Sequence, residues 1–235
     1  MISGTTIGIL LYTIPFCILA FHSFGRYLND KQNPQKKHIF YAFVSVSIGF
    51  MLNSIGALLV SPDMSTNQRM VVSALTTLFD AFNMIGVFWF FVFLTDFIER
   101  MKKYILFVAV HLAVTLIVIL VTPADVIVLD AEHIRERSDV HSAAILFFWF
   151  LYFGMIAYQF WKYSGLMTKK TAIRRAQMMS AGALFAVLAY IFVIAAQVSQ
   201  DAVLVYLAES CAVASGIVFY AGFVAPERLR RMLEK

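Results

Sequence analysis

Three ionisable residues lie deep within apolar stretches of the sequence, where a charge is costly, so each indicates either a functional site or a structural partner. They are Asp80, His111 and Glu209. Two neighbouring carboxyl groups can share a proton, so Asp80 and Glu209 together suit proton transfer or the binding of a polar ligand. Alternatively, each carboxyl group can form a hydrogen bond that joins two helices. His111, with Thr115 one helical turn away, is interpreted as a packing residue.

Further polar residues fall at about the depth of these two carboxyl groups. Thr76, Asp80 and Asn83 recur at i, i+4 and i+7, which places them on one face of a helix. Polar residues of three other apolar stretches reach the same level. If these faces meet, they line a pocket that opens outward. The predicted ligand-binding residues are Asp80, Glu209, Asn53, Asn83, Tyr190, Tyr206 and Thr76.

The elements that must position this pocket are membrane-spanning helices. Hydrophobic residues make up 61% of the 235-residue chain and charged residues only 14%, against about a quarter in soluble domains. Each crossing of a bilayer needs about 20 apolar residues, and a spanning segment satisfies its own backbone as a helix. Seven runs are long enough. They lie near 5–24, 39–60, 71–95, 104–122, 141–163, 177–198 and 202–224.

The basic residues predict the direction of these spans. Of the nineteen Lys and Arg residues, all but Arg69, Arg135 and Arg137 fall in the first, third and fifth loops or in the C-terminal tail. Because basic loops stay in the cytoplasm, we expect an all-α bundle of seven transmembrane helices, with the N-terminus outside and the C-terminus cytoplasmic. The expected location is the cell membrane of a prokaryote.

The longest external connection runs from about Pro123 to Asp139 and is rich in charge. Three interpretations stay open for it: a solvated loop, a short amphipathic helix, or a lid over an external cavity. The two cysteines, Cys17 and Cys211, lie inside apolar runs and are interpreted as packing residues rather than a disulfide.

Several classes of chemistry find no support in the residue pattern. No lysine lies within a span, so a retinal Schiff base has no attachment point and no cofactor is expected. The five histidines are scattered, and no metal site or catalytic motif is recognisable, so we do not expect an enzyme. The net charge of +5 serves as a topology signal, and no nucleic acid is expected as a partner.

The cytoplasmic end carries a resemblance to a known family. The fifth loop closes with Arg174-Arg175-Ala176-Gln177, and the last span is followed by Pro226 and a basic stretch to Lys235, which is predicted to form a short amphipathic helix over 226–235. This arrangement resembles the seven-helix N-terminal sensor regions of bacterial and archaeal histidine kinases. The family usually has a tryptophan after the proline, where this chain has Arg228-Leu229.

The resemblance implies a receptor-like sensor in the lipid bilayer that detects a small or membrane-dissolved ligand. No kinase domain follows Lys235 in this sequence, so the expected output is a cytoplasmic signalling protein. The residues expected to contact it are Lys169, Lys170, Arg174, Arg175, Arg228, Arg230 and Arg231. The alternatives are a small-molecule or proton-coupled transporter that titrates Asp80 and Glu209 and, third, a membrane enzyme acting on lipid.

Overall fold

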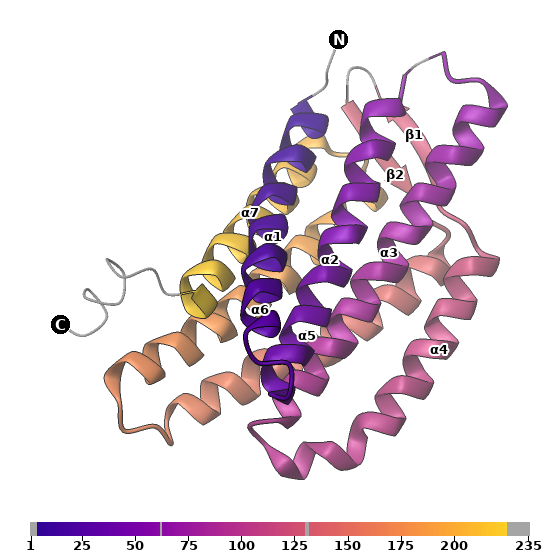
Figure 1. Cartoon of the computed structure of the whole chain (residues 1–235). Helices are drawn as coiled ribbons and strands as arrows, with labels where there is room; N and C mark the ends of the chain where they lie inside the picture. The colour runs from indigo at the N-terminus through magenta and orange to yellow at the C-terminus, as the bar shows by residue number, and fades with distance from the viewer. Residues whose placement is uncertain (1–3, 62, 130–131, 225–235) are drawn as a thin grey trace.

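Long apolar helices dominate the chain, and seven of those in the described residues are long and apolar enough to cross a membrane. The computed structural model describes residues 4–61, 63–129 and 132–224. This result confirms the seven predicted spans and indicates a multi-pass membrane protein (Figure 1). The helices are α1 (Gly4–Leu28), α2 (Pro34–Leu59), α3 (Thr66–Thr95), α4 (Ile105–Val121), α5 (Asp139–Ser164), α6 (Lys170–Ser199) and α7 (Ala202–Val224). The predicted amphipathic helix over 226–235 lies outside the described residues.

Helix boundaries follow local capping signals. Asn33 accepts hydrogen bonds from the backbone N–H groups of Gln35 and Lys36 at the start of α2, with Pro34 in the first turn. Ser65 and Gln68 form a capping box at the start of α3. A 3-10 helix, η1 (Glu99–Tyr104), leads into α4. These polar caps extend the helices beyond the apolar runs by which they were predicted.

The neighbour relations of the helices describe a closed ring. In the order α1, α2, α3, α5, α6, α7, each helix packs on the next, and α7 returns to α1. Helix α4 packs outside this ring against α3 and α5, and many of its large apolar side chains are exposed, as on a surface that faces lipid. The ring therefore has an interior that six helices can line.

Hydroxyl groups join neighbouring helices across the ring. Ser47 of α2 donates to the backbone carbonyl of Phe16 in α1 at 2.7 Å, and Ser215 of α7 donates to that of Gly182 in α6 at 2.8 Å. Because lipid does not drive apolar helices together, hydrogen bonds and close backbone approach contribute much of the packing specificity.

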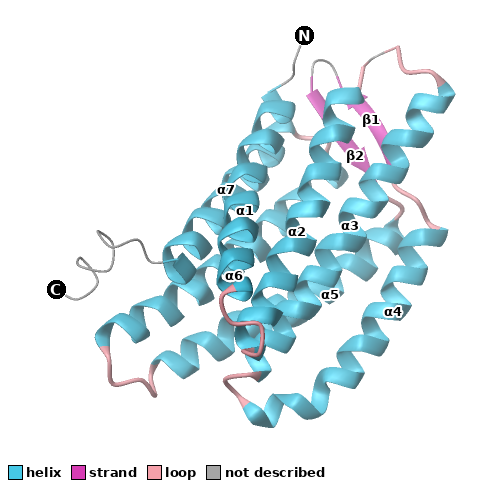
Figure 2. Ribbon diagram, viewed as in Figure 1, coloured by secondary structure: helices cyan, strands magenta, loops and turns pink. Residues whose placement is uncertain are grey.

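The connection between α4 and α5 is a β-hairpin rather than the amphipathic helix considered from its charge pattern (Figure 2). Strands β1 (Asp125–Leu129) and β2 (Glu132–Glu136) pair antiparallel, with Ile127 opposite Ile134. The run Val126-Ile127-Val128 favours strand because β-branched residues suit an extended backbone. The hairpin lies against α1, α3, α6 and α7, so it covers one end of the ring.

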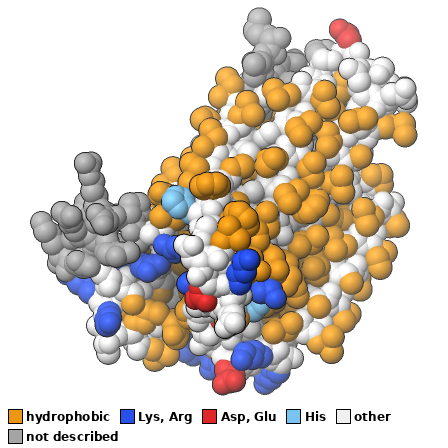
Figure 3. Space-filling model, in the orientation of Figure 1, with side chains coloured by type: hydrophobic (Ala, Val, Ile, Leu, Met, Phe, Trp, Pro, Cys, Tyr) orange, Lys and Arg blue, Asp and Glu red, His pale blue; other side chains and the backbone are white. Residues whose placement is uncertain are grey.

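The two ends of the bundle differ in charge. We call the end that carries β1 and β2 the hairpin end, and the opposite end the basic end, where the α1–α2, α3–α4 and α5–α6 connections lie. Lys and Arg side chains gather at the basic end, while apolar side chains cover the helices between the two ends (Figure 3). The basic residues that share the first, third and fifth loops of the sequence therefore also lie at one end of the bundle.

Candidate functional site

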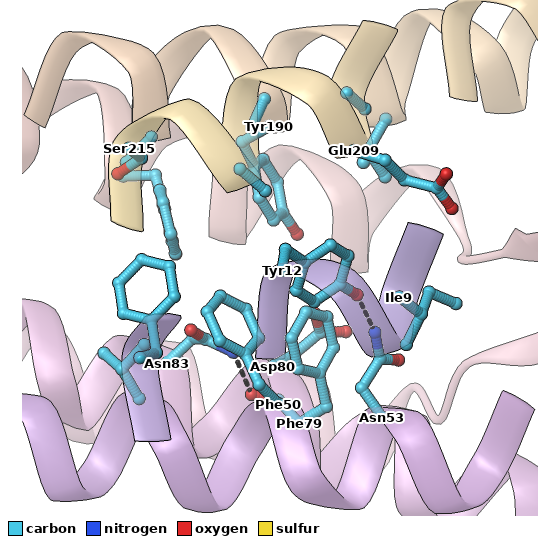
Figure 4. Close-up of a pocket in the computed structure, with 18 of the residues that line it drawn as sticks. Ile9, Tyr12, Phe50, Asn53, Phe79, Asp80, Asn83, Tyr190, Glu209 and Ser215 are labelled. Atoms are coloured by element: carbon cyan, nitrogen blue, oxygen red, sulfur yellow. Dashed lines mark hydrogen bonds between the residues drawn. The ribbon is translucent and has the colours of Figure 1, made fainter. Parts of the chain in front are cut away.

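The ring of helices encloses a cavity that begins near the hairpin end (Figure 4). Its volume is about 130 Å³, and all six ring helices contribute to its wall. On α7 the wall runs from Val205 to Phe219, a length on the order of 20 Å at about 1.5 Å per residue. Most of the wall is apolar. Its polar members are Thr5, Tyr12, Asn53, Asp80, Asn83, Arg137, Trp149, Tyr190, Glu209 and Ser215.

A buried ion pair forms the polar centre of this cavity. Arg137 Nε lies 2.8 Å from Asp80 Oδ2, and Arg137 Nη2 lies 2.9 Å from Asp80 Oδ1. The two side chains are only 2% and 1% exposed, so the pair is bidentate and shielded from solvent. Burial alone would lower the pKa of the Arg137 guanidinium, but the charge and hydrogen bonding of Asp80, together with Tyr190 and Tyr12, outweigh this effect and raise that pKa above its ordinary value. Arg137 is therefore a permanent cation.

His141 adds a third polar side chain to the pair. Its Nε2 lies 3.1 Å from Asp80 Oδ2, and its Nδ1 lies 2.5 Å from the backbone carbonyl oxygen of Thr122. Both ring nitrogens therefore face acceptor oxygens, and the contact with Asp80 ties the start of α5 to α3.

The hairpin strands are fixed to the bundle at both of their outer ends. Before β1, the backbone N–H of Ala124 donates to Thr77 Oγ1 at 3.1 Å, and Ser73 donates to the carbonyl of Ala124. After β2, the backbone carbonyl of Arg137 accepts from Gln197 Nε2 at 2.6 Å. Ser138 then caps the first turn of α5 by accepting from the backbone N–H of His141. These contacts hold Arg137 and His141 in place beside α3.

Tyrosine and tryptophan side chains line the cavity next to the ion pair. Asn53 Nδ2 donates to the hydroxyl of Tyr12, a contact between α2 and α1. The ring of Tyr190 stacks on Trp149 with centroids 5.1 Å apart and an angle of 20°, and Tyr190 points across the cavity toward Tyr12 (Figure 4). Among the described residues, no hydrogen-bond partner is present for Tyr190 OH, Trp149 Nε1 or Arg137 Nη1.

Glu209 reaches the cavity from α7 by packing against the surface of α1. A Cβ atom at Gly8 would collide with Glu209 Oε2, so a larger residue at this position would displace the carboxylate from its present place. Glu209 is 8% exposed. The hypothesis of a proton shared between Asp80 and Glu209 is not the arrangement found, because both Asp80 oxygens bind the Arg137 guanidinium.

The structure brings together five of the seven residues predicted to bind a ligand. Asp80, Glu209, Asn53, Asn83 and Tyr190 line the cavity. The other two predicted residues do not belong to its wall. Thr76 is buried in α3 one turn away from Asp80, and Tyr206 is 40% exposed on α7.

Sequence reasoning missed Arg137, His141, Tyr12 and Trp149. Arg137 was interpreted as one of a few basic residues on a solvated external loop, but it is 3% exposed. Both Arg137 and His141 lie beside the N-cap Ser138 at the entry of α5, and their spacing alone did not indicate that they reach Asp80 in the middle of α3. His111, interpreted as a packing residue, lies 2.9 Å from the hydroxyl of Tyr152 through its Nδ1.

The described residues among those predicted to contact a partner lie at the basic end, where Arg175, and also Arg26 of α1, bind the end of α7. Arg175 donates to the backbone carbonyls of Gly222 and Phe223, and Arg26 donates to those of Phe223 and Val224. These carbonyls belong to the last described residues of α7. Lys170 and Arg174 lie in the first turns of α6, directly after Lys169. Arg228, Arg230 and Arg231 lie outside the described residues.

Within the described part of the chain, no group of three or more His, Cys, Asp or Glu residues is arranged to hold a metal ion. What the arrangement offers is binding: an apolar cavity with buried hydrogen-bond donors and one charged cluster at its hairpin end. No family model matches the sequence, and no curated protein matches it.

Proposed function

We propose that this chain is a receptor-like sensor of a prokaryotic cell membrane that binds a small or membrane-dissolved molecule in the cavity at the hairpin end. In this proposal the hairpin end faces outward and the basic end faces the cytoplasm, following the distribution of basic residues. The observation that carries the proposal is the cavity itself: an apolar space in the ring interior, with buried polar groups at one end.

An aromatic barrier at the inner end of the cavity favours a sensor. The rings of Phe43, Phe90 and Phe219 pack against one another with centroids 5.1, 5.3 and 6.1 Å apart. They come from α2, α3 and α7, and all three are at most 1% exposed. A ligand can therefore enter from the hairpin end or the lipid side without an open route to the basic end.

Helix α7 is suited to carry a response between the two ends. Its Glu209 and Phe219 line the cavity, and its last carbonyls are held by Arg26 of α1 and Arg175 of α6. A ligand that binds one arrangement of α1, α6 and α7 better than another would shift the population toward it. The same shift would move the basic residues at the start of α6, which we propose contact an acidic surface of a cytoplasmic signalling protein.

The resemblance to the sensor regions of histidine kinases agrees with this output. It supports the proposal through the topology and the basic entry of α6, and it assigns no ligand. Lys169, Lys170 and Arg174 are the described residues that we propose contact the partner, while Arg175 would act by holding α7.

The proposal is tested by asking whether the cavity is occupied. Ala212 lines the cavity on α7, so Ala212→Leu should fill part of it, whereas Ala113→Leu changes an exposed position on α4 and serves as a matched control. We expect native mass spectrometry of protein released from nanodiscs to find a bound molecule in wild type and Ala113→Leu that is absent in Ala212→Leu. The same bound molecules in all three proteins would contradict the proposal.

A transporter is the second candidate, and one observation favours it. A separate cavity of about 530 Å³ lies at the basic end, with Arg26, Lys36 and Arg175 in its wall. Phe43, Phe90 and Phe219 lie between the two cavities in the order of residues along α2, α3 and α7, as expected for a closed gate. Solute flux into liposomes that is lost in Ala212→Leu and retained in Ala113→Leu would favour this function over the sensor.

A further inference from the structure

Three buried hydrogen-bond donors belong to residues that line the cavity from different parts of the chain. They are Nη1 of Arg137, the hydroxyl of Tyr190 and Nε1 of Trp149, which precede α5, lie in α6 and lie in α5, respectively. Each residue lines the cavity and is at least nine-tenths buried, at 3%, 7% and 8% exposure. Native proteins rarely leave buried donors unpaired, so such a group indicates a missing acceptor.

The charge around these donors favours an acceptor over a cation. Both oxygens of Asp80 are already taken by Arg137, and His141 contacts one of them as well. The cluster therefore holds the Arg137 guanidinium as a fixed cation, and the oxygens of its carboxylate partner are already occupied. Glu209 supplies a second carboxylate from α7, but it packs against Gly8 on α1. A ligand oxygen beside Arg137 would meet donors on several sides.

The rest of the cavity suits a hydrocarbon chain. Its wall extends on the order of 20 Å along α7 at about 1.5 Å per residue. Beyond the polar cluster the wall is mainly aliphatic and aromatic, and it ends at Phe90 and Phe219. A hydrocarbon chain matches an apolar wall of this length.

We infer that the cavity binds an acyl chain, whose terminal oxygen accepts hydrogen bonds from Arg137, Tyr190 and Trp149 while its hydrocarbon part extends toward Phe219. This inference rests on the proposed ligand-binding function and names its chemical class. The acceptor is either the carboxylate of a free fatty acid or the carbonyl of an acyl ester, as in a membrane lipid. Both present the same oxygen chemistry to the three donors.

The test compares three probes of equal chain length, decanoate, methyl decanoate and decane, by their binding to the full chain in nanodiscs. Tyr190→Phe removes one donor that bonds to nothing else among the described residues, so it should fold normally. We expect it to weaken binding of an oxygen-bearing probe about tenfold and to leave decane unaffected. Tyr152→Phe removes a buried hydroxyl that contacts His111 outside the cavity, and should change none of the three affinities.

The pattern of affinities separates the two sources of the acceptor. Binding of decanoate but not methyl decanoate would support the inference and assign a free acid, because only the acid is an anion. Comparable binding of both, each weakened by Tyr190→Phe, would support it and assign an acyl ester. Trp149→Phe provides a second donor variant, for which the same loss is expected.

Failure of the inference differs from failure of the proposed function. If decane and decanoate bind equally well, and neither Tyr190→Phe nor Trp149→Phe changes their affinities, the inference of a bound acyl oxygen is wrong. The proposed function, a ligand bound in the cavity, would not be contradicted by that result. If none of the probes binds and Ala212→Leu leaves the bound molecules of the purified protein unchanged, both the inference and the proposed function are wrong.

Discussion

Removing both partners of the buried pair between Asp80 and Arg137 should destabilise the fold by less than the sum of the two single removals. Each single variant, Asp80→Asn or Arg137→Gln, leaves the other charge buried at 1% or 2% exposure without its two charge-assisted hydrogen bonds. Breaking a buried pair in this way costs about 3–5 kcal/mol. The double variant removes both charges of the pair. We therefore expect its loss of unfolding free energy to be about 2–3 kcal/mol smaller than the sum of the losses in the two single variants.

The assay is a double-mutant cycle of unfolding free energies, measured by circular dichroism in mixed micelles as the fraction of denaturing detergent rises. The ion pair of Lys36 with Asp30 is a matched control, because its N–O distance is also 2.8 Å but its side chains are 36% and 42% exposed. There the coupling should be below about 1 kcal/mol. Losses that add within about 0.5 kcal/mol for Asp80 and Arg137 would refute the reasoning.

Three further predictions follow from other contacts. The coupling between Asp80 and Arg137 should be equal at pH 7 and pH 10, because a raised pKa keeps Arg137 charged and its contribution is lost only as pH rises through that pKa; a weaker coupling at pH 10 would contradict this. Gly8→Val should displace Glu209 and cost about 1–3 kcal/mol of unfolding free energy, whereas an unchanged value would show that the helices separate freely. Arg175→Ala should cost about 1–3 kcal/mol in the same assay, while Lys102→Ala, in an exposed pair, stays within about 0.5 kcal/mol; equal effects would exclude a role in holding α7.

The seven helices could be predicted because the length of an apolar run is a local property of the sequence. Asp80 and Glu209 could be singled out for a related reason, since an ionisable residue inside such a run must have a cause. Their depth along each helix then placed Asn53 and Tyr190 at the same level. These inferences needed only the rise per residue of a helix.

The partners of Asp80 could not be predicted in this way, because they depend on which helices are neighbours. The closed ring brings the start of α5 beside α3, so Arg137, which was interpreted as a loop residue, binds the buried carboxylate of Asp80. The position of Thr76 could not be predicted for a similar reason. It lies on the same face of α3 as Asp80, but the cavity does not extend one helical turn further. The hairpin was obscured because its charges suggested an exposed helix.

The most direct test of the ligand site is an experimental structure of the chain in nanodiscs with decanoate that carries bromine on its last carbon. We expect the carboxylate within hydrogen-bond distance of Arg137 and Tyr190, and the bromine near Phe219 at the inner end of the cavity. A cavity without ligand density, with bromine found only on the lipid-facing surface, would contradict the account.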